Sequence, residues 1–364
     1  MTSIAPVAPP RRVTVGVDTH KHVHVAVALD DLGGRLDNIT VSADTGGYAQ
    51  LHQWAQSLGK VEAFGIEGTG SYGAGLASFL RRQGQRIVKV NRGDRRTRRQ
   101  NGKSDTLDAE TAARSVLNGN ATSVPKSADG LSEMIRQIKV ARDTAGKGRT
   151  AAIITLKTIV VNAPAELRET LDGLADKALI DRCAGFRPGR VANTTASAKH
   201  ALRALAKRWL DLEAEVKSHD VVLGDLTVQS SPTLCEGFGI GADTAAEILI
   251  VFGDNPARIR SEGAFAKLCG TAPMPASSGM TNRHRLSRGG HRQANAALYR
   301  AVIVTHAFSR THHHLSHPED SRRPHEEGHH PLPEALFSQR GVPACDGRPP
   351  SSLGADFLPL KGSS

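Results

Sequence analysis

The sequence predicts a mixed α/β domain in the N-terminal third of the chain, followed by a helical connector and a mainly α-helical C-terminal domain. Three observations carry this prediction. Residues 13–41 contain three runs in which apolar and polar side chains alternate, which is typical of strands joined by hairpins. Strand and helix patterns then alternate up to residue 90. The chain has 364 residues, enough for two domains and a connector.

Three strands open the predicted sheet. Alternating valines and leucines predict the first two over residues 13–18 and 23–29, and Gly33-Gly34 turns the chain into a third around Ile39 and Val41. Because the connections are short, we expect these strands to be antiparallel neighbours.

Helix and strand patterns follow in alternation. A helix over residues 51–58 ends at Gly59, and a strand over residues 63–66 ends at Glu67. A second helix over residues 76–80 and a strand over residues 87–90 come next. Three hairpin strands followed by alternating helices and strands fit a ribonuclease-H-like mixed sheet.

The remaining chain is predicted to divide into a connector, a second compact unit and a tail. Leu202, Leu205, Trp209, Leu212 and Val216 form one apolar stripe, which fits a helical connector, a short coiled coil or ordinary helix packing. Composition predicts disorder at both ends. The expected boundaries are a disordered N-terminus over residues 1–12, the α/β domain over 13–128, the connector over 129–230, the second domain over 231–310 and a disordered tail over 311–364.

The charge balance points to a polyanionic partner. Lysine and arginine outnumber aspartate and glutamate by 47 to 36, giving a net charge of +11 and an isoelectric point near 9.8. Such a surface favours nucleic acid, because each neutralised phosphate releases counterions. The four cysteines are scattered without metal-ligand spacing, which favours the cytoplasm. No apolar run is long enough to span a membrane.

Four carboxylates are candidate metal ligands. Asp18 and Glu67 end two predicted strands, whereas Asp105 and Asp108 lie three residues apart at a predicted helix start and so share a face. Carboxylates gathered in this way repel one another unless a cation such as Mg²⁺ or Mn²⁺ neutralises them. Two such ions can activate an attacking oxygen and stabilise a leaving one in phosphodiester chemistry. The alternative for Asp105 is a structural role as the helix N-cap.

Two groups of basic residues are candidate phosphate contacts. The first precedes the acid pair and the second lies in the C-terminal unit, although each could instead be a solvated face. They are Arg95, Arg96, Arg98, Arg99 and Lys103 in the first group, and Arg283, Arg285, Arg288 and Arg292 in the second.

The C-terminal unit contains two further motifs. Glycines over residues 237–241 precede an apolar helix, as in helix-hairpin-helix DNA binders, although a glycine turn between packed helices is also possible on this pattern. Ser277 and Ser278 lie in a predicted Pro- and Gly-rich loop close to the second basic group. A serine facing many cations suits attack on a phosphodiester, whereas the spacing alone is that of an ordinary loop.

These residues resemble those of a bacterial transposase family, the insertion-sequence-one-ten (DEDD) transposases. The resemblance lies in residues 16–21, 65–70 and 102–109, which contain the four acids, and in residues 277–279 and 287–290. It covers roughly residues 13–310 in the right order. Family members continue beyond this point with a basic helical segment, which the tail lacks. A shifted reading frame is therefore one explanation of the tail, and genuine disorder is the other.

The resemblance implies a fold, a reaction and partners. The N-terminal domain would have the fold of Holliday-junction resolvases (RuvC-like), and the C-terminal domain would supply a serine nucleophile, Ser278 by the better match and Ser277 otherwise. A dimer or tetramer guided by a structured RNA would cut and rejoin DNA, with the metal-bound tetrad and the serine in one composite site. Two alternatives stay open: a nuclease that uses the tetrad alone, and a non-catalytic nucleic-acid-binding protein.

Overall fold

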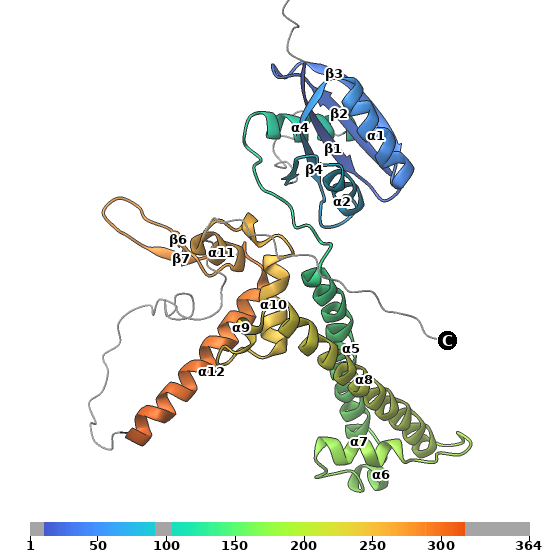
Figure 1. Cartoon of the computed structure of the whole chain (residues 1–364). Helices are drawn as coiled ribbons and strands as arrows, with labels where there is room; N and C mark the ends of the chain where they lie inside the picture. The colour runs from blue at the N-terminus through green and yellow to red at the C-terminus, as the bar shows by residue number, and fades with distance from the viewer. Residues whose placement is uncertain (1–10, 92–103, 288, 317–364) are drawn as a thin grey trace, which may run out of the picture.

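The computed structural model describes residues 11–91, 104–287 and 289–316 (Figure 1). Its N-terminal part is a five-stranded sheet in the order β3-β2-β1-β4-β5. The strands are β1 Arg12–Thr19, β2 Val23–Leu29, β3 Arg35–Ser42, β4 Lys60–Glu67 and β5 Ile87–Val90.

The sheet is mixed, as predicted. β1, β2 and β3 pair antiparallel, whereas β4 pairs parallel to both β1 and β5. A mixed α/β domain of this kind is consistent with a ribonuclease-H-like fold. The parallel pairing of β1 with β4 matters most for function, because it brings the carboxyl ends of these strands to one edge of the sheet.

Helices cover both faces of the sheet. Helices α1 Thr45–Ser57 and α2 Ala74–Arg82 enclose one apolar core with β1 and β4, in which Phe64 and Ile66 are fully buried. The opposite face is covered by α4 Asp105–Leu117, whose Ala109 and Ala113 pack against β2. Small alanine side chains allow α4 to approach the sheet closely.

The approach of α4 is closest at two strand glycines. A Cβ atom built on Gly16 of β1 would lie 2.0 Å from the Ala109 carbonyl oxygen and 2.3 Å from the Ala113 nitrogen. On β4, a Cβ on Gly65 would lie 2.6 Å from Val116 and 3.0 Å from the Ala112 oxygen. The helix backbone therefore rests directly on the backbone of both strands, at positions that only glycine permits.

The C-terminal part is mainly helical, as predicted. Helices α5 and α8 lie side by side as a long arm, with α6 and α7 at its far end (Figure 1). The elements are α5 Leu131–Val161, α6 Ala165–Glu169, α7 Asp176–Ala184, α8 Thr194–Ser230, α9 Pro232–Cys235, α10 Ala242–Phe252, η1 Pro256–Arg258, α11 Glu262–Cys269, β6 Pro273–Pro275, β7 His284–Leu286 and α12 Arg292–Ser316.

The apolar stripe of α8 packs within the chain. Leu202 is fully buried beside Leu156 of α5, and Trp209 packs against the same core. Leu212 lies over Gly148 of α5, where a Cβ would meet it at 3.2 Å. Among the three uses that the sequence left open for this stripe, the structure therefore shows an intramolecular helix pair.

A buried ion-pair network holds the helices together where the arm meets α10 and α12. Lys139 of α5 is 5% exposed, and its Nζ lies 2.6 Å from Asp143, 3.1 Å from Asp243 and 3.1 Å from Glu247. Arg300 of α12 binds Asp243 at 2.9 Å. Because a buried ammonium is costly unless it is paired, these three carboxylates are what allow Lys139 to stay charged in the interior.

The segment between α4 and α5 is hydrogen-bonded on both sides. Arg81 of α2 donates to the Ser127 carbonyl at 2.8 Å and lies 3.3 Å from Asp129. From the other side, Asn255 accepts from the Ser127 nitrogen at 3.1 Å and donates to the Pro125 carbonyl at 2.9 Å. The boundary that we predicted at residue 128 falls within this segment, which attaches the sheet domain to the helical part.

Two elements extend past the predicted domain boundaries. β1 begins at Arg12, within the N-terminal stretch expected to be disordered, and α12 continues to Ser316, beyond the boundary predicted at residue 310. The rest of the predicted tail lies outside the described residues. No described helix is long and apolar enough to cross a membrane.

The contact at Gly16 can be tested by adding one methyl group. We expect Gly16→Ala to lower the free energy of unfolding of the sheet domain by at least about 2 kcal/mol, since both clashing atoms belong to backbone. Chemical denaturation followed by circular dichroism measures the change.

Gly146→Ala is the matched control. This glycine lies inside α5 with no atom within 4 Å of its added Cβ, so alanine should be neutral or should stabilise the helix by up to about 1 kcal/mol. Equal stability of wild type and Gly16→Ala would contradict the packing argument.

Candidate metal centre and candidate nucleophile

Two of the predicted carboxylates lie at the adjacent ends of β1 and β4. Val17 pairs with Ile66, so the next residues, Asp18 and Glu67, lie side by side at the ends of these strands. Each is only 7% exposed. Thr19 donates from Oγ1 to the Glu67 carbonyl at 2.9 Å and fixes the two strand ends to each other.

The other two carboxylates come from the first turn of α4. Ser104 is the N-cap, and its side chain accepts a hydrogen bond from the Leu107 nitrogen at 3.2 Å. The alternative that Asp105 caps the helix is therefore wrong, because a hydroxyl takes that position one residue earlier. The Asp105 side chain is exposed to solvent, whereas the side chain of Asp108, one turn further along the helix, is partly buried.

Three of these acids, Asp18, Asp105 and Asp108, are close enough to interact electrostatically. Burial raises the pKa of Asp18, His20 opposes this shift, and the negative charges of Asp108 and Asp105 raise the pKa further. A buried carboxylate repelled by two others is stabilised by a cation with oxygen-binding preference. The donor set thus fits a divalent cation.

His20 also faces this site, which the sequence interpretation missed. Its Nε2 lies 3.2 Å from Asp18 Oδ2 and 3.5 Å from Asp105 Oδ2. One donor atom from each of these three residues lies within 4.8 Å of the others, close enough to hold one metal ion. The sequence signal that could have revealed His20 is its place two positions after an aspartate that ends a predicted strand.

The candidate nucleophile lies at the tip of a β-hairpin. The predicted loop connects β6 to β7, which pair antiparallel, and Ser278 and Thr281 exchange backbone hydrogen bonds at 3.2 Å and 3.1 Å across the tip. Ser277 donates to Asn282 at 2.9 Å and accepts from the Arg283 nitrogen at 3.3 Å. Among the described residues, no hydrogen bond engages the exposed Ser278 hydroxyl, which favours it over Ser277 as a reactive group.

The base of this hairpin is held by a close backbone contact. A Cβ atom on Gly290 would lie 2.2 Å from the Gly270 nitrogen, and the His291 nitrogen donates to the Leu268 carbonyl at 2.7 Å. Gly290 belongs to one of the motifs quoted above, so that motif has a packing role. Figure 1 shows the hairpin projecting outward, away from the five-stranded sheet.

The glycine segment before α10 is packed inside the C-terminal part. Gly239 has a positive φ of 78°, and a Cβ there would lie 3.1 Å from the Ala301 oxygen of α12. Thr305 of α12 donates to the Phe238 carbonyl at 3.4 Å. This arrangement matches the alternative of a glycine turn between packed helices.

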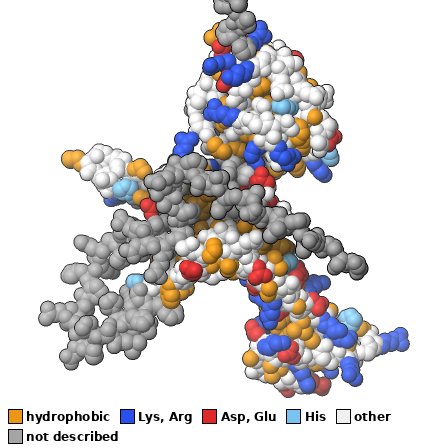
Figure 2. Space-filling view, viewed as in Figure 1, with side chains coloured by type: hydrophobic (Ala, Val, Ile, Leu, Met, Phe, Trp, Pro, Cys, Tyr) orange, Lys and Arg blue, Asp and Glu red, His pale blue; other side chains and the backbone are white. Residues whose placement is uncertain are grey.

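The predicted basic residues are only partly described. Arg283, Arg285 and Arg292 are exposed on and beside the hairpin. In Figure 2, Lys and Arg side chains are spread over the visible sheet domain and the far end of the α5–α8 arm. The predicted contacts outside the described residues are Arg95, Arg96, Arg98, Arg99, Lys103 and Arg288.

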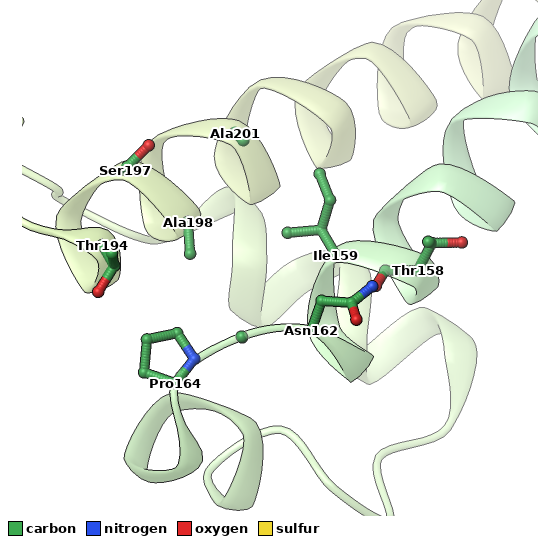
Figure 3. A pocket seen from close by; sticks show the side chains of 9 residues that line it. Thr158, Ile159, Asn162, Pro164, Thr194, Ser197, Ala198 and Ala201 are labelled. Atoms are coloured by element: carbon green, nitrogen blue, oxygen red, sulfur yellow. The ribbon is translucent and has the colours of Figure 1, made fainter.

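A shallow pocket lies at the far end of the arm, between the end of α5 and the start of α8 (Figure 3). Its volume is about 350 Å³, and Ile159, Asn162, Pro164 and Ser197 contribute to its lining. The lining contains no titratable side chain, so this pocket lacks the groups that phosphodiester chemistry needs.

Comparison with known families covers both candidate sites. A family model of DEDD transposases of the IS110 group, described as "Transposase", matches residues 15–163 and includes Asp18, Glu67, Asp105 and Asp108. A second, described as "Transposase IS116/IS110/IS902 family", matches residues 232–316 and includes Ser278. A comparison with curated proteins found no match. The two ranges together cover more than half of the chain. The chain therefore belongs to the IS110 family of transposases.

Proposed function

We propose that this transposase cuts and rejoins DNA with Asp18, Glu67, Asp105 and Asp108 as ligands of Mg²⁺ or Mn²⁺ and with Ser278 as the nucleophile. The observation that carries the metal assignment is the convergence of carboxylates from two strand ends and one helix start. Asp18 is buried and repelled by the α4 pair, a cost that a bound cation would offset.

The residues of the metal centre have separate tasks in this proposal. Bound divalent metal would stabilise charge on the attacking and leaving oxygens of a phosphodiester. Asp18 and Glu67 hold the inner side of the site, where burial excludes water. Asp105 and Asp108 close it from α4, which is anchored by the Ser104 cap and the contact at Gly16.

The Ser278 hydroxyl supplies the bond that links protein to DNA. Its Oγ forms a bond to phosphorus while the bond from phosphorus to a deoxyribose oxygen breaks, and the hydroxyl proton leaves to solvent. A DNA hydroxyl then attacks the phosphoseryl link and releases Oγ. Each phosphodiester that is broken is thus replaced by a new one, and the DNA strands are exchanged. The exposed Arg283 and Arg285 are suited to hold the phosphate.

A second copy of the chain completes the site in this proposal. The hairpin projects away from the sheet domain of its own chain (Figure 1), which favours use of the serine on a partner's carboxylates. The α5 arm offers a surface for pairing: Val140, Ile154 and Val161 are 55%, 59% and 67% exposed and fall on one heptad position, with Lys147 between them.

The nucleic-acid partners in this proposal are DNA and a structured guide RNA. The arginine-rich run from Arg95 to Lys103 joins β5 to α4, so both of its attachment points adjoin the carboxylates: Val90 pairs with Glu67, and α4 begins at Asp105. This placement supports phosphate contacts beside the cutting site.

A nuclease that uses the tetrad alone is the second candidate. The same separation of the hairpin from the sheet domain favours it, since the carboxylates gather without any contribution from Ser278. The two functions differ in whether a covalent protein–DNA intermediate forms.

The carboxylates of α4 give the first test of the proposal. We expect Asp105→Asn and Asp108→Asn each to reduce cleavage of branched DNA in Mg²⁺ by at least about a hundredfold, because each loses ligand charge that stabilises the transition state. Their melting temperatures should change by less than about 3 °C, since neither change opens a core cavity. Gel assays and thermal melting provide the measurements.

Glu110→Gln serves as the control on the same helix. Glu110 pairs with Arg114 at 2.7 Å and is not one of the proposed ligands, so Glu110→Gln should leave cleavage near wild type. Near-normal cleavage by either aspartate variant would exclude the metal-site assignment.

The serine gives the second test. Ser278→Ala should abolish the covalent adduct with labelled DNA on denaturing gels while retaining DNA binding, because one exposed hydroxyl is lost and the cations remain. Ser277→Ala should keep the adduct, with a lower yield, since Ser277 bonds to Asn282 and Arg283 within the hairpin tip. An adduct that survives in Ser278→Ala and vanishes in Ser277→Ala would move the assignment to Ser277, whereas cleavage without any adduct would favour the nuclease.

A further inference from the structure

His20 occupies a fixed position at the edge of the candidate metal centre. It directly follows β1, and its backbone nitrogen donates to the Val23 carbonyl at 3.1 Å, which closes the turn into β2. The side chain is 45% exposed, so water reaches the ring from outside. Its Nε2 atom, however, is buried and therefore turned toward the carboxylates.

The nitrogen lies close to two carboxylates at once. Nε2 is 3.2 Å from Asp18 Oδ2 and 3.5 Å from Asp105 Oδ2. One donor atom from each of the three residues lies within 4.8 Å of the other two, which is close enough for all three to bind one ion.

An imidazole nitrogen changes which ion such a site prefers. Mg²⁺ takes oxygen ligands almost alone, whereas Mn²⁺ and later transition ions accept imidazole as well as carboxylate. A set made of two carboxylates and one imidazole within 4.8 Å therefore differs from an all-carboxylate site. Adding the nitrogen favours a first-row transition ion such as Mn²⁺ over Mg²⁺, because Mg²⁺ prefers oxygen ligands and usually keeps several waters.

We propose that His20 Nε2 is a direct ligand of a metal ion held by Asp18 and Asp105, and that this nitrogen gives the site a preference for Mn²⁺ over Mg²⁺. The inference rests on the metal centre of the proposed function. It assigns to that centre a fifth protein ligand that the four-carboxylate description lacks.

Mn²⁺ bound to the full-length protein tests the assignment directly. Pulsed electron paramagnetic resonance detects a ¹⁴N nucleus bonded to Mn²⁺, so wild type should show imidazole coupling and His20→Ala should lose it. His22→Ala is the matched control: His22 lies in the same turn, is exposed and is outside the cluster, so the coupling should persist. His20→Gln provides a second variant that keeps a polar side chain without an imidazole, should the alanine variant unfold.

Calorimetric titration provides the second readout. His20→Ala should weaken Mn²⁺ binding at least about tenfold, the lower end of the loss caused by removing even an outer-shell partner, while Mg²⁺ affinity changes less than about threefold. Wild-type Mn²⁺ binding that disappears in Asp108→Asn but shows no ¹⁴N coupling would overturn the His20 inference and leave the metal centre standing. Mn²⁺ binding unaffected by Asp108→Asn would instead overturn the metal centre itself.

Discussion

The contact between α4 and the backbones of β1 and β4 determines where the four candidate metal-binding carboxylates lie. Gly16 and Gly65 leave no room for a side chain between strand and helix, so α4 sits at a fixed depth and orientation on the sheet. The parallel pairing of β1 with β4 places Asp18 and Glu67 at one edge. The same helix then delivers Asp105 and Asp108 from its first turn to that edge. As a consequence, the negative charges of Asp105 and Asp108 repel Asp18, and a bound cation would offset this repulsion.

The C-terminal part also contains a close backbone contact at glycines, which here fixes the base of the β6–β7 hairpin. Gly270 and Gly290 bring two backbones together at the base of the hairpin, while the tip that contains Ser278 is fully exposed. Ser278 therefore lies at the exposed tip of a short hairpin whose base is held in place. The hydrogen-bonded segment around Ser127 and Asn255 connects this part to the sheet domain. One chain thus has its carboxylates on the sheet domain and Ser278 on a separate hairpin. This separation suits a reaction whose site is assembled from two copies of the chain.

Sequence reasoning predicted the sheet domain well because its strands are short, valine-rich and separated by turn residues. It located Asp18 and Glu67 correctly at strand ends for the same reason. The β6–β7 hairpin was missed because β6 is three residues long and contains Pro273 and Pro275, which strand propensity disfavours. His20 was missed because the direction of its ring depends on the turn closed by Val23 and on α4, a contact distant in sequence. Residues 92–103, which contain the whole first basic group, are outside the described ranges, so that group stays a prediction.

Co-expression of two differently tagged inactive variants tests most directly whether carboxylates and serine from separate copies form one site. One chain carries Asp108→Asn and keeps its serine, and the other carries Ser278→Ala and keeps its carboxylates. With divalent metal and labelled DNA, the account predicts a covalent adduct on the Asp108→Asn chain, in the mixed assembly and in neither variant alone. A mixed assembly that forms no adduct, while the wild type with the same tags does, would contradict the account and place both groups of each active site in one chain.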